Sequence, residues 1–495
     1  MSGLRGALMV CGTSSGAGKS TIVTGLCRLL ARRGVRVAPF KAQNMSNNAG
    51  VCADGAEIGR AQYAQALAAG IEPTADLNPI LLKPIDDHRS QVIVHGAPAA
   101  EVGATDYAAR SGDLLDLAAD SLVRVRERFD VVVVEGAGSP SEVNLLERDV
   151  ANLPLAARAG IDAVLVADID RGGMLAAAYG TIALLPAELR DRIRGIVVNR
   201  FRGELSLLRP GLELLEERTG VPVLGVVPFL PGAVDAEDSL DVPSPAASRP
   251  DALVVAVLRT PRISNFTDLE PLAAEPDVAV RFVSRPDELA DADVIVLPGS
   301  RAVAADLAWL RETGLADAVL RSDALVLGVC GGYQMLGETV VDEHGVEGQP
   351  GTIAGLGLLP VTTRLERDKI TSVRHGRAIG CDVGGYEIRH GRPVRTGGEG
   401  WIELDDELGD EGAVRDDRVF GTSLHGLFEN DDFRGTFLSR AAARSGRALS
   451  PRTESFAAAR ARFHDALADA LEANLDLDRI ASLIAAAVPA PVASG

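Results

Sequence analysis

The residues best suited to covalent chemistry in this chain of 495 residues surround a single cysteine. Cys330 follows the apolar run 324–329 and is flanked by Gly328, Gly331 and Gly332. Small neighbours permit a strained turn between a strand and a helix, and the start of that helix favours the thiolate over the thiol. The pattern predicts a nucleophile elbow, whereas a buried cysteine without such neighbours is usually a small hydrophobic residue.

A thiolate nucleophile needs a base, and His425 in the segment TSLHGLFEN is the one of the seven histidines that stands in a strand-then-turn setting. The segment LPGSR at 297–301 ends another apolar run with a glycine turn. The backbone N–H groups of such a turn can stabilise the oxyanion that forms when Cys330 attacks a carbonyl. The residues expected to form this oxyanion hole are Gly299, Ser300 and Gly331.

The segment GTSSGAGKST at 12–21 predicts a second reactive site, because it follows a short apolar run and precedes an amphipathic helix. In such loops the backbone N–H groups surround a phosphate, the lysine reaches the terminal phosphates and the next hydroxyl holds Mg²⁺. The strict GxxxxGK[ST] pattern would place a glycine at position 13, so this loop is a variant. The residues expected to bind the nucleotide are Gly12, Thr13, Gly16, Gly18, Lys19, Ser20 and Thr21.

Three further polar segments are expected to line the same site. Glu135 ends the apolar run 131–135, where a carboxylate can hold Mg²⁺ directly or through water, or can simply be solvated. The long polar stretch 40–62 is more typical of a ligand-binding loop than of a core. Asn199 follows another apolar run, and its amide could read the adenine edge or form a turn. The expected metal ligands are Ser20, Asp54 and Glu135, and the expected substrate contacts are Lys41, Gln43 and Asn44.

The composition is that of a multi-domain globular protein, with 46% hydrophobic and 24% charged residues. The net charge of −19 repels polyanions and argues against nucleic acid as a partner. No apolar stretch has the length needed to span a bilayer, and the first residues lack the features of a secretory signal. The five cysteines show no metal-binding spacing. We therefore expect a cytoplasmic protein with neither a nucleic-acid nor a membrane partner.

Apolar runs alternate with amphipathic Ala/Leu segments along both halves of the chain. This alternation predicts an α/β fold with two doubly wound domains, each built on a largely parallel sheet. A stretch rich in Pro, Ser and acidic residues near position 240 predicts the boundary between them. The expected division is a first domain at 1–235, a linker at 236–250, a second domain at 251–440, and terminal helices at 441–495 that pack on the second domain.

The segments GVCGGYQ and LHGLFE resemble class I glutamine amidotransferase domains, which hydrolyse glutamine through a thioester on the cysteine. The resemblance implies a flavodoxin-like second domain with Cys330 and His425 as catalytic residues. Such domains usually carry an acid two residues after the histidine, where this chain has Leu427, and Glu429 comes two residues later. A Cys–His dyad or a different orienting group is therefore expected.

The variant phosphate loop resembles the dethiobiotin synthetase-like branch of the P-loop NTPases, which implies a P-loop NTPase-like parallel sheet in the first domain. Partitioning and septum-placement ATPases carry an extra lysine early in the loop, where this chain has Ser14. Taken together, the two halves resemble the cobyric acid synthase family over nearly the whole chain. The segments that carry this resemblance are APFKAQNMSNN, GRAQ, NPILLKP, EGAGSPSEVNLLERDVAN, VADIDRGG, NRFRG, GYEIRHG and TSLHGLFEN.

The resemblance implies ATP and Mg²⁺ as cofactors, and glutamine and a corrinoid as partners. The acceptor would be adenosylated cobyrinic acid a,c-diamide, whose b, d, e and g carboxylates are amidated in turn through acyl phosphates. Asp149 resembles the catalytic acid that the family places near the phosphorylated group, although it could instead cap a helix. Ammonia is expected to follow an enclosed path from Cys330 to the ATP site. The cations expected to offset the charge of the polyanionic substrate are Lys41, Lys83, Arg89, Arg148 and Arg171.

Two other interpretations stay open. A cobyrinic acid a,c-diamide synthase would have the same architecture, although KAQNM, NPILLKP and GYEIRHG favour the first family. The chain could also be a P-loop regulatory ATPase whose second domain is a degenerate, amidase-like binding module. Ser14 and the presence of both Cys330 and His425 argue against that role. The sequence does not specify an oligomeric state.

Overall fold

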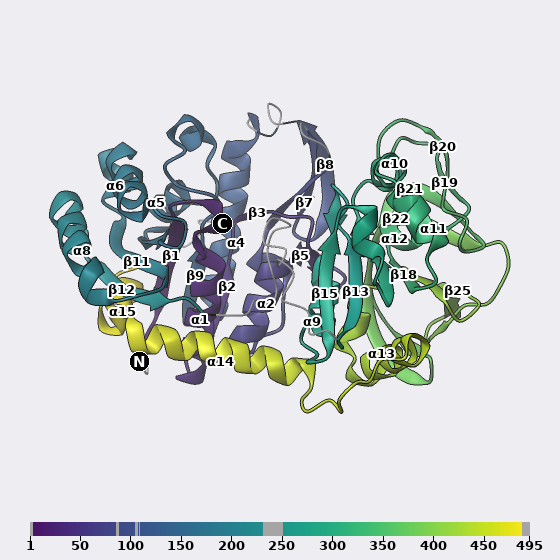
Figure 1. Cartoon of the computed structure of the whole chain (residues 1–495). Coiled ribbons are helices and arrows are strands. Elements are labelled where there is room, and N and C mark those ends of the chain that lie inside the picture. Colours follow the sequence, from purple (N-terminus) through teal and green to yellow (C-terminus); the bar gives the residue numbers. More distant parts are fainter. Residues whose placement is uncertain (1–2, 86–88, 104–106, 108, 231–250, 488–495) are drawn as a thin grey trace.

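The computed structural model describes residues 3–85, 89–103, 107, 109–230 and 251–487. It shows two α/β units side by side with a small sheet between them (Figure 1). Residues 236–250, the expected linker, lie outside the described residues. None of the helices within the described ranges combines the length and the apolar composition needed to cross a bilayer.

The main sheet of the first domain contains six parallel strands. Its central strands are nearly continuous runs of Val, Ala and Leu, because helices cover both faces and neither face meets water. The central position of the first strand brings the loop after it to the carboxyl edge of the sheet, where ligands bind in open α/β folds. In spatial order the strands are β12 (Val223–Pro228), β11 (Ile193–Phe201), β10 (Asp162–Asp168), β1 (Gly6–Gly12), β9 (Val131–Glu135) and β2 (Val37–Phe40).

Helices cover both faces of this sheet, as expected for a doubly wound domain. One face packs mainly against α4, α5, α6 and α8, and the other mainly against α1 and the C-terminal end of the chain. The helices contributed by the first domain itself are α1 (Lys19–Arg32), α2 (Arg60–Ala69), α4 (Ser111–Arg128), α5 (Leu153–Ala159), α6 (Met174–Leu184), α7 (Ala187–Arg190) and α8 (Leu205–Thr219).

An insertion between β2 and β9 builds the side of the first domain that faces the second. It consists of a four-stranded sheet, β3-β6-β7-β8, and the hairpin β4-β5. Buried apolar residues of this insertion pack against Tyr386 and Ile388 of the second domain, so the insertion forms part of the domain interface. Its strands are β3 (Gln43–Met45), β4 (Ala49–Val51), β5 (Glu57–Gly59), β6 (Ile80–Pro84), β7 (Arg89–Val94) and β8 (Ala97–Gly103).

The second domain contains a sheet whose parallel strands follow the flavodoxin-like order, β15-β13-β16-β18-β26, with β25 added antiparallel at the edge. The strands of this domain core are β13 (Leu253–Leu258), β14 (Ile263–Ser264), β15 (Val278–Val283), β16 (Val294–Leu297), β17 (Gly299–Ser300), β18 (Leu325–Val329), β25 (Ala413–Arg415) and β26 (Val419–Thr422). Its helices are α9 (Glu270–Ala273), α10 (Val303–Glu312), α11 (Leu315–Arg321), α12 (Gly331–Leu336) and α13 (Asp431–Ser445).

A further, mostly antiparallel sheet in the second domain was not expected from the sequence. It centres on the long hairpin of β21 and β22, whose register shifts between Leu365 and Ile370. The extra residues bulge toward the first domain, where Lys369 forms an ion pair with Glu57. The strands of this sheet are β19 (Thr339–Asp342), β20 (Gly351–Ala354), β21 (Val361–Ala378), β22 (Cys381–Arg395), β23 (Ile402–Leu404) and β24 (Asp410–Glu411).

The last two helices pack on the first domain, which corrects the expectation that the terminal helices at 441–495 would cover the second. Residues 441–445 end α13 of the second domain, and residues 488–495 lie outside the described residues. α14 (Phe456–Asn474), the long yellow helix in Figure 1, returns along α1, and α15 (Leu477–Ala485) reaches β1. The physical reason is an apolar sheet face that α1 covers only in part. Buried side chains of the C-terminal helices, among them Leu471, Leu483 and Ile484, complete its cover.

Leu471 tests this packing. It is 2% exposed, and a Cβ built on Gly25 of α1 would lie 2.6 Å from its Cδ1, so the two helices are in close contact. Leu471→Ala should lower the free energy of unfolding of the first domain by about 2–5 kcal/mol in urea denaturation, because it leaves a cavity. The neighbouring Glu472→Ala, which removes only a partly exposed ion pair with Arg33, should change it by less than about 1 kcal/mol. Equal effects would contradict the packing.

Candidate active sites

The phosphate loop lies against the turn that follows β9. Lys19 is 3% exposed, and its Nζ donates to the carbonyl oxygens of Ser14, Ser15 and Gly138 at 3.0, 3.2 and 3.0 Å. α1 begins at Lys19, so the positive end of its dipole and its free N–H groups face the loop. The sequence residues 12–21 thus occupy the strand–loop–helix setting that anion binding requires.

Asn199 supports this loop from the end of β11. Its Nδ2 donates to the carbonyl oxygen of Ala17 at 3.0 Å, and a Cβ on Gly18 would lie 2.1 Å from the same Nδ2. Gly18 also has φ of +91°, so two constraints require glycine there. Arg200 donates to the carbonyl oxygen of Gly16 at 3.0 Å. The amide nitrogen of Asn199 is therefore engaged with the loop itself, and adenine recognition by this residue stays a prediction.

Ser20 and Glu135 form a hydroxyl–carboxylate pair whose oxygen donors suit a hard divalent cation. Glu135 is completely buried, and its Oε1 accepts from Ser20 Oγ at 2.8 Å and from Lys41 Nζ at 2.9 Å. Its Oε2 accepts from Gln65 Nε2 at 2.5 Å. Lys41, expected from the sequence to contact the substrate, therefore pairs with Glu135 beside the phosphate loop, and substrate contact by this residue stays a prediction.

Asp54 lies apart from this pair. It occupies an exposed turn between β4 and β5, where its Oδ1 accepts from the N–H of Ala56 at 3.0 Å. A Cβ on the adjacent Gly55 would lie 3.5 Å from the carbonyl oxygen of Thr371 in the second domain. A local Asx turn at the domain interface thus uses Oδ1 of Asp54, and its role as a metal ligand stays a prediction.

A cleft of about 760 Å³ opens beside the phosphate loop. Its lining includes Ser15, Gln43, Gly138, Asp149 and, from the second domain, Arg262. The apolar side chains of Met45 and Leu145 also line it and are 56% and 48% exposed. Large apolar side chains left in contact with water at the edge of a cleft mark a surface for an apolar ligand face.

Gln43 and Asn44 separate across β3, because neighbouring side chains of a strand point to opposite faces. Gln43 lines the cleft and accepts a hydrogen bond from the hydroxyl of Tyr107. Asn44 is 2% exposed and donates from Nδ2 to Gln62 Oε1 at 3.0 Å. The expectation of substrate contact at Asn44 is corrected on this geometry, because its side chain is enclosed between β3 and α2.

Asp149 lines the cleft and also caps the turn before α5. Its Oδ1 accepts from the backbone N–H groups of Ala151 and Asn152 at 2.8 and 2.9 Å, and its Oδ2 from Asn152 Nδ2 at 3.0 Å. Burial raises the pKa of Asp149, and these hydrogen bonds oppose the rise. The N-cap residue of α5 is Asn152 rather than Asp149, so Asp149 stabilises the turn one step earlier, and its role as a catalytic acid stays a prediction.

The other four cations expected to offset the charge of the substrate lie in three different places. Arg89 and Arg148 line the cleft. Lys83 is buried and forms an ion pair with Glu57 at 2.6 Å. Arg171 lies at the phosphate loop, since a Cβ on Gly16 would be 3.4 Å from its Nη2.

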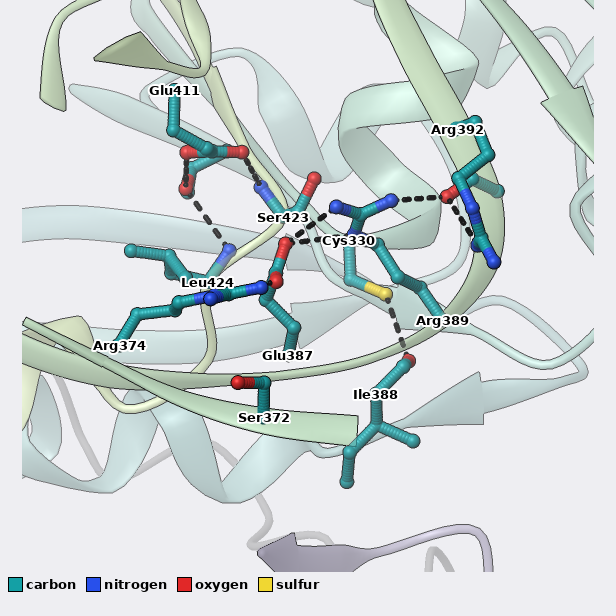
Figure 2. Close-up of polar contacts among 12 residues, drawn as sticks. Cys330, Ser372, Arg374, Glu387, Ile388, Arg389, Arg392, Glu411, Ser423 and Leu424 are labelled. Carbon is teal, nitrogen blue, oxygen red and sulfur yellow. Dashed lines mark hydrogen bonds and ion pairs between the residues drawn. The ribbon is translucent and has the colours of Figure 1, made fainter. Parts of the chain in front are cut away.

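Cys330 stands at the carboxyl end of β18 in a strained conformation, with φ of +51° and ψ of −105°. The flanking glycines permit this turn, because a Cβ on Gly332 would lie 1.9 Å from the carbonyl oxygen of Leu297 and one on Gly328 2.7 Å from that of Gly332. The Sγ atom points toward the carbonyl oxygen of Ile388, 3.6 Å away (Figure 2). The structure has the elbow geometry that the glycine pattern predicted.

His425 lies beside Cys330, although it comes 95 positions later in the chain, and its imidazole interacts with the thiol. It is 2% exposed, its ring stacks on Tyr386 at 5.4 Å, and its Nδ1 is 2.7 Å from Asp268 Oδ2. Burial by itself lowers the pKa of His425, but the charges of Asp268 and Cys330 and their hydrogen bonds raise it to about 10. These contacts favour an imidazolium next to the cysteine.

Sequence reasoning did not assign Asp268. It belongs to the short 3₁₀ helix Phe266–Leu269 and precedes His425 by 157 residues, so no local spacing connects the two. The two residues considered instead lie elsewhere. Leu427 is buried among apolar side chains, and Glu429 forms ion pairs with Arg60 at 2.7 Å and Arg460 at 3.1 Å.

The residues predicted for the oxyanion hole meet next to Cys330. A Cβ on Gly331 would lie 2.6 Å from the backbone nitrogen of Ser300, and one on Gly299 would lie 3.3 Å from Cε1 of His425. Ser300 Oγ donates to Asp306 Oδ2 at 2.6 Å, which fixes the turn. Backbone N–H groups at the turn beside the cysteine are suited to stabilise an oxyanion.

Charged side chains of β21 and β22 surround the other side of Cys330 (Figure 2). Glu387 is 1% exposed and pairs with Arg374 Nε at 3.0 Å and Arg389 Nη2 at 2.6 Å. Gln334 of α12 is 4% exposed, and its Oε1 has no hydrogen-bond partner among the described residues. A buried, unpaired amide oxygen beside a nucleophile is suited to accept a hydrogen bond from a bound substrate. Gln334 lies in the segment GVCGGYQ, and Glu387 and Arg389 lie in GYEIRHG. The spacing within these segments did not predict a role for any of the three.

Two family models match the chain, one in each half. The CobQ/CobB/MinD/ParA nucleotide binding domain family matches residues 8–242, and the CobB/CobQ-like glutamine amidotransferase domain family matches residues 254–433. Cobyric acid synthases of Nocardia farcinica and Rhodococcus jostii are each 49% identical to the chain, over 98% of it and over 98% and 96% of their own lengths. The cobyric acid synthase of Streptomyces coelicolor is 47% identical over 98% of both chains.

The fold and the two sites thus define an ATP-dependent amide-forming ligase with its own glutamine amidotransferase domain. The match covers nearly the whole of each chain. The chain belongs to the cobyric acid synthase family.

Gly331 provides a test of the oxyanion hole. Gly331→Ala would place a methyl group 2.6 Å from the Ser300 nitrogen and displace a donor, so the turnover of glutamine to glutamate should fall about 10²–10³-fold. Gly351→Ala is the matched control, because nothing lies within 4 Å of a Cβ at that position. An unchanged glutaminase rate in folded Gly331→Ala protein would rule out this geometry.

Proposed function

We propose that this enzyme amidates peripheral carboxylates of a corrinoid, using ATP to activate each carboxylate and glutamine as the source of ammonia. The observation that carries the proposal is the continuity of one cleft with the phosphate loop, since Ser15 and Gly138 line the cleft and accept the hydrogen bonds of Lys19. The thiol site at Cys330 supplies the other half-reaction. Membership of the cobyric acid synthase family supports the b, d, e and g carboxylates of adenosylcobyrinic acid a,c-diamide as the acceptors.

A carboxylate is a poor electrophile, so the synthetase half must first activate it. One carboxylate oxygen of the corrinoid attacks the γ-phosphorus of ATP, ADP leaves, and an acyl phosphate forms. Attack of ammonia on its carbonyl carbon then releases phosphate and gives the amide. Lys19 is placed to neutralise charge on the transferred phosphoryl group, and loop N–H groups bind the phosphates. Asp149 stands at the same end of the cleft.

Mg²⁺ fits the donor set at this end of the cleft. The Ser20 hydroxyl and the Glu135 carboxylate, 2.8 Å apart, would hold it, as in other phosphate loops with an acidic strand end. When bound, the ion supplies charge neutralisation for the phosphates. Lys41 keeps Glu135 paired within the buried site.

Glutamine hydrolysis takes place at Cys330 in the second domain. The Cys330 thiolate adds to the side-chain carbonyl carbon, and the oxyanion is stabilised by N–H groups at Ser300 and Gly331. His425 donates a proton to the leaving nitrogen, so that neutral ammonia departs and a thioester remains. Water then hydrolyses the thioester to glutamate. The unpaired Oε1 of Gln334 and the charges of Glu387 and Arg389 would bind the polar groups of the amino acid.

Ammonia must cross the domain interface before it is protonated. Buried charged side chains form a cluster at the interface between the domains. Glu57 and Lys83 come from the first domain, and Lys369 and Arg301 from the second. Lys83 stands between cleft residues Leu82 and Pro84, and Arg301 follows the oxyanion turn. Burial, together with the charges of Lys83 and Arg301, lowers the pKa of Lys369 to about 7. A place that disfavours one ammonium group in this way disfavours ammonium as well and is compatible with passage of neutral ammonia.

A mass-resolved assay with Mg-ATP, glutamine and adenosylcobyrinic acid a,c-diamide tests the whole reaction. Each amidation replaces OH by NH₂ and lowers the corrinoid mass by about one unit; the product should carry amides at b, d, e and g. Cys330→Ala should abolish turnover with glutamine and retain it with ammonium. Glutamine hydrolysis without any corrinoid product would exclude this acceptor. Amidation at a and c of the unamidated corrinoid would identify the alternative diamide synthase.

The arginines of the cleft test where the corrinoid binds. Arg148 is exposed, lines the cleft and has a charge that can pair with a peripheral carboxylate. Arg148→Ala should raise KM for the corrinoid about 10-fold, as expected for one charge-assisted contact, while KM for glutamine stays constant. Arg321→Ala, at an exposed arginine of α11, is the control. An unchanged corrinoid KM for Arg148→Ala would place the acceptor elsewhere.

A further inference from the structure

The histidine of the glutaminase site contacts a buried carboxylate. This carboxylate belongs to a residue far before the histidine in the chain, whereas related domains carry the acid two residues after it. We infer that Asp268 is the positioning residue of this site, completing a Cys330–His425–Asp268 triad with an acid from the opposite end of the domain's sequence. The inference rests on the proposed glutamine hydrolysis at Cys330. It assigns the orienting role that the sequence left open between a dyad and another group.

Both oxygens of Asp268 are directed at the histidine segment. Oδ2 lies 2.7 Å from Nδ1 of His425, and Oδ1 accepts from the backbone N–H of Gly426 at 3.0 Å. The first contact fixes the tautomer with the proton on Nδ1 and leaves Nε2 for the thiol. The second contact, from the Gly426 N–H, restricts rotation of the carboxylate group of Asp268. Asp268 is 8% exposed, so water competes little for either bond.

The alternative acid is used elsewhere. Glu429 is in the turn that follows His425, but its two oxygens pair with Arg60 of α2 and Arg460 of α14. It therefore connects the second domain to two helices that pack on the first. Leu427, at the position where related domains carry the acid, fills an apolar cluster. In the part of the chain that the structure describes, neither residue hydrogen-bonds to the imidazole, whereas Asp268 does.

The first domain fixes the segment that carries Asp268. Asn265, with φ of +50°, immediately precedes the 3₁₀ helix, and its Oδ1 accepts from the N–H of Ala49 at 3.0 Å. Tyr386, whose ring stacks on His425, donates its hydroxyl to the carbonyl oxygen of the same Ala49 at 3.1 Å. Acid and base are thus held relative to each other through one residue of β4.

The charge of Asp268 sets the protonation of the histidine. The charged and titratable groups that face His425 are Asp268, the Cys330 thiol and the Tyr386 hydroxyl. Burial lowers the pKa of His425, whereas Asp268 and Cys330 raise it to about 10. Loss of the Asp268 charge must therefore lower this pKa. The imidazolium that donates to the leaving ammonia would then lose its proton at a lower pH.

The test is the pH profile of glutamine hydrolysis by the full-length enzyme. Asp268→Asn, nearly the same shape without the charge, should lower kcat about 10²-fold, less than the loss for the corresponding change in a serine triad because a thiolate is intrinsically more nucleophilic. KM for glutamine should stay constant, and the alkaline limb of the kcat profile should move to lower pH. Asp268→Glu, which keeps the charge, should retain more activity than Asp268→Asn.

Glu429→Gln is the matched control, since it neutralises the other nearby carboxylate. Its alkaline limb should coincide with that of the unaltered enzyme. Rates of Asp268→Asn and Asp268→Glu are compared well below the unfolding midpoint of each variant, which separates positioning from folding. The inference would be overturned if the pH profile shifted in Glu429→Gln and stayed in place in Asp268→Asn. It would also be overturned if Asp268→Asn changed only KM for glutamine and left kcat unchanged. Absence of glutaminase activity in the unaltered enzyme would instead reject the proposed function.

Discussion

Both backbone groups of Ala49 are hydrogen-bonded to the second domain, and the arrangement of the two reactive sites depends on this contact. The N–H donates to Asn265, beside the 3₁₀ helix of Asp268, and the carbonyl accepts from Tyr386, which stacks on His425. β4 pairs with β5, and α2 begins directly after β5. Gln65 of that helix donates to Glu135 next to the phosphate loop. A continuous set of rigid contacts therefore runs from the thiol site to the nucleotide site.

Buried charge is the second constraint on the interface. Glu135 and Glu57 have no exposed surface, and each contacts at least one lysine. Taking such ions out of water costs several kcal/mol each, so each must keep its partners. The pair of Glu57 with Lys369 joins the two domains, whereas its pair with Lys83 lies within the first. Opening the interface would therefore leave Lys369 without its carboxylate partner.

The C-terminal helices link the same two domains by packing. α13 belongs to the second domain, and the chain then returns to the first, where α14 lies along α1. Ion pairs of α1 with Asp465 and Asp469 flank the apolar contact. Because α1 also starts at the phosphate loop, the end of the chain supports the helix on which nucleotide binding depends.

The local motifs of the sequence determined both reactive loops. The glycine pattern around Cys330 and the segment 12–21 each require a strand, a tight turn and a helix, and backbone geometry alone enforces that order. Pairing of Cys330 with His425 and of Ser20 with Glu135 was also predictable, because the ends of parallel strands meet at one edge of a sheet. Strand alternation, by contrast, separated Gln43 from Asn44, although the two are neighbours in one polar segment.

Other features were decided only by tertiary structure. Asp268 reaches His425 through the packing of a short helix across 157 residues, and no spacing rule connects them. Asp54 lies in a turn at the domain interface, and α14 packs on the first domain. Neither position could be predicted, because hydrogen-bond partners and exposed apolar sheet faces exist only after folding. The sequence by itself determined which chemistry each loop can perform. Tertiary structure decided which distant side chains serve that chemistry, since long-range contacts are set by packing rather than by position in the chain.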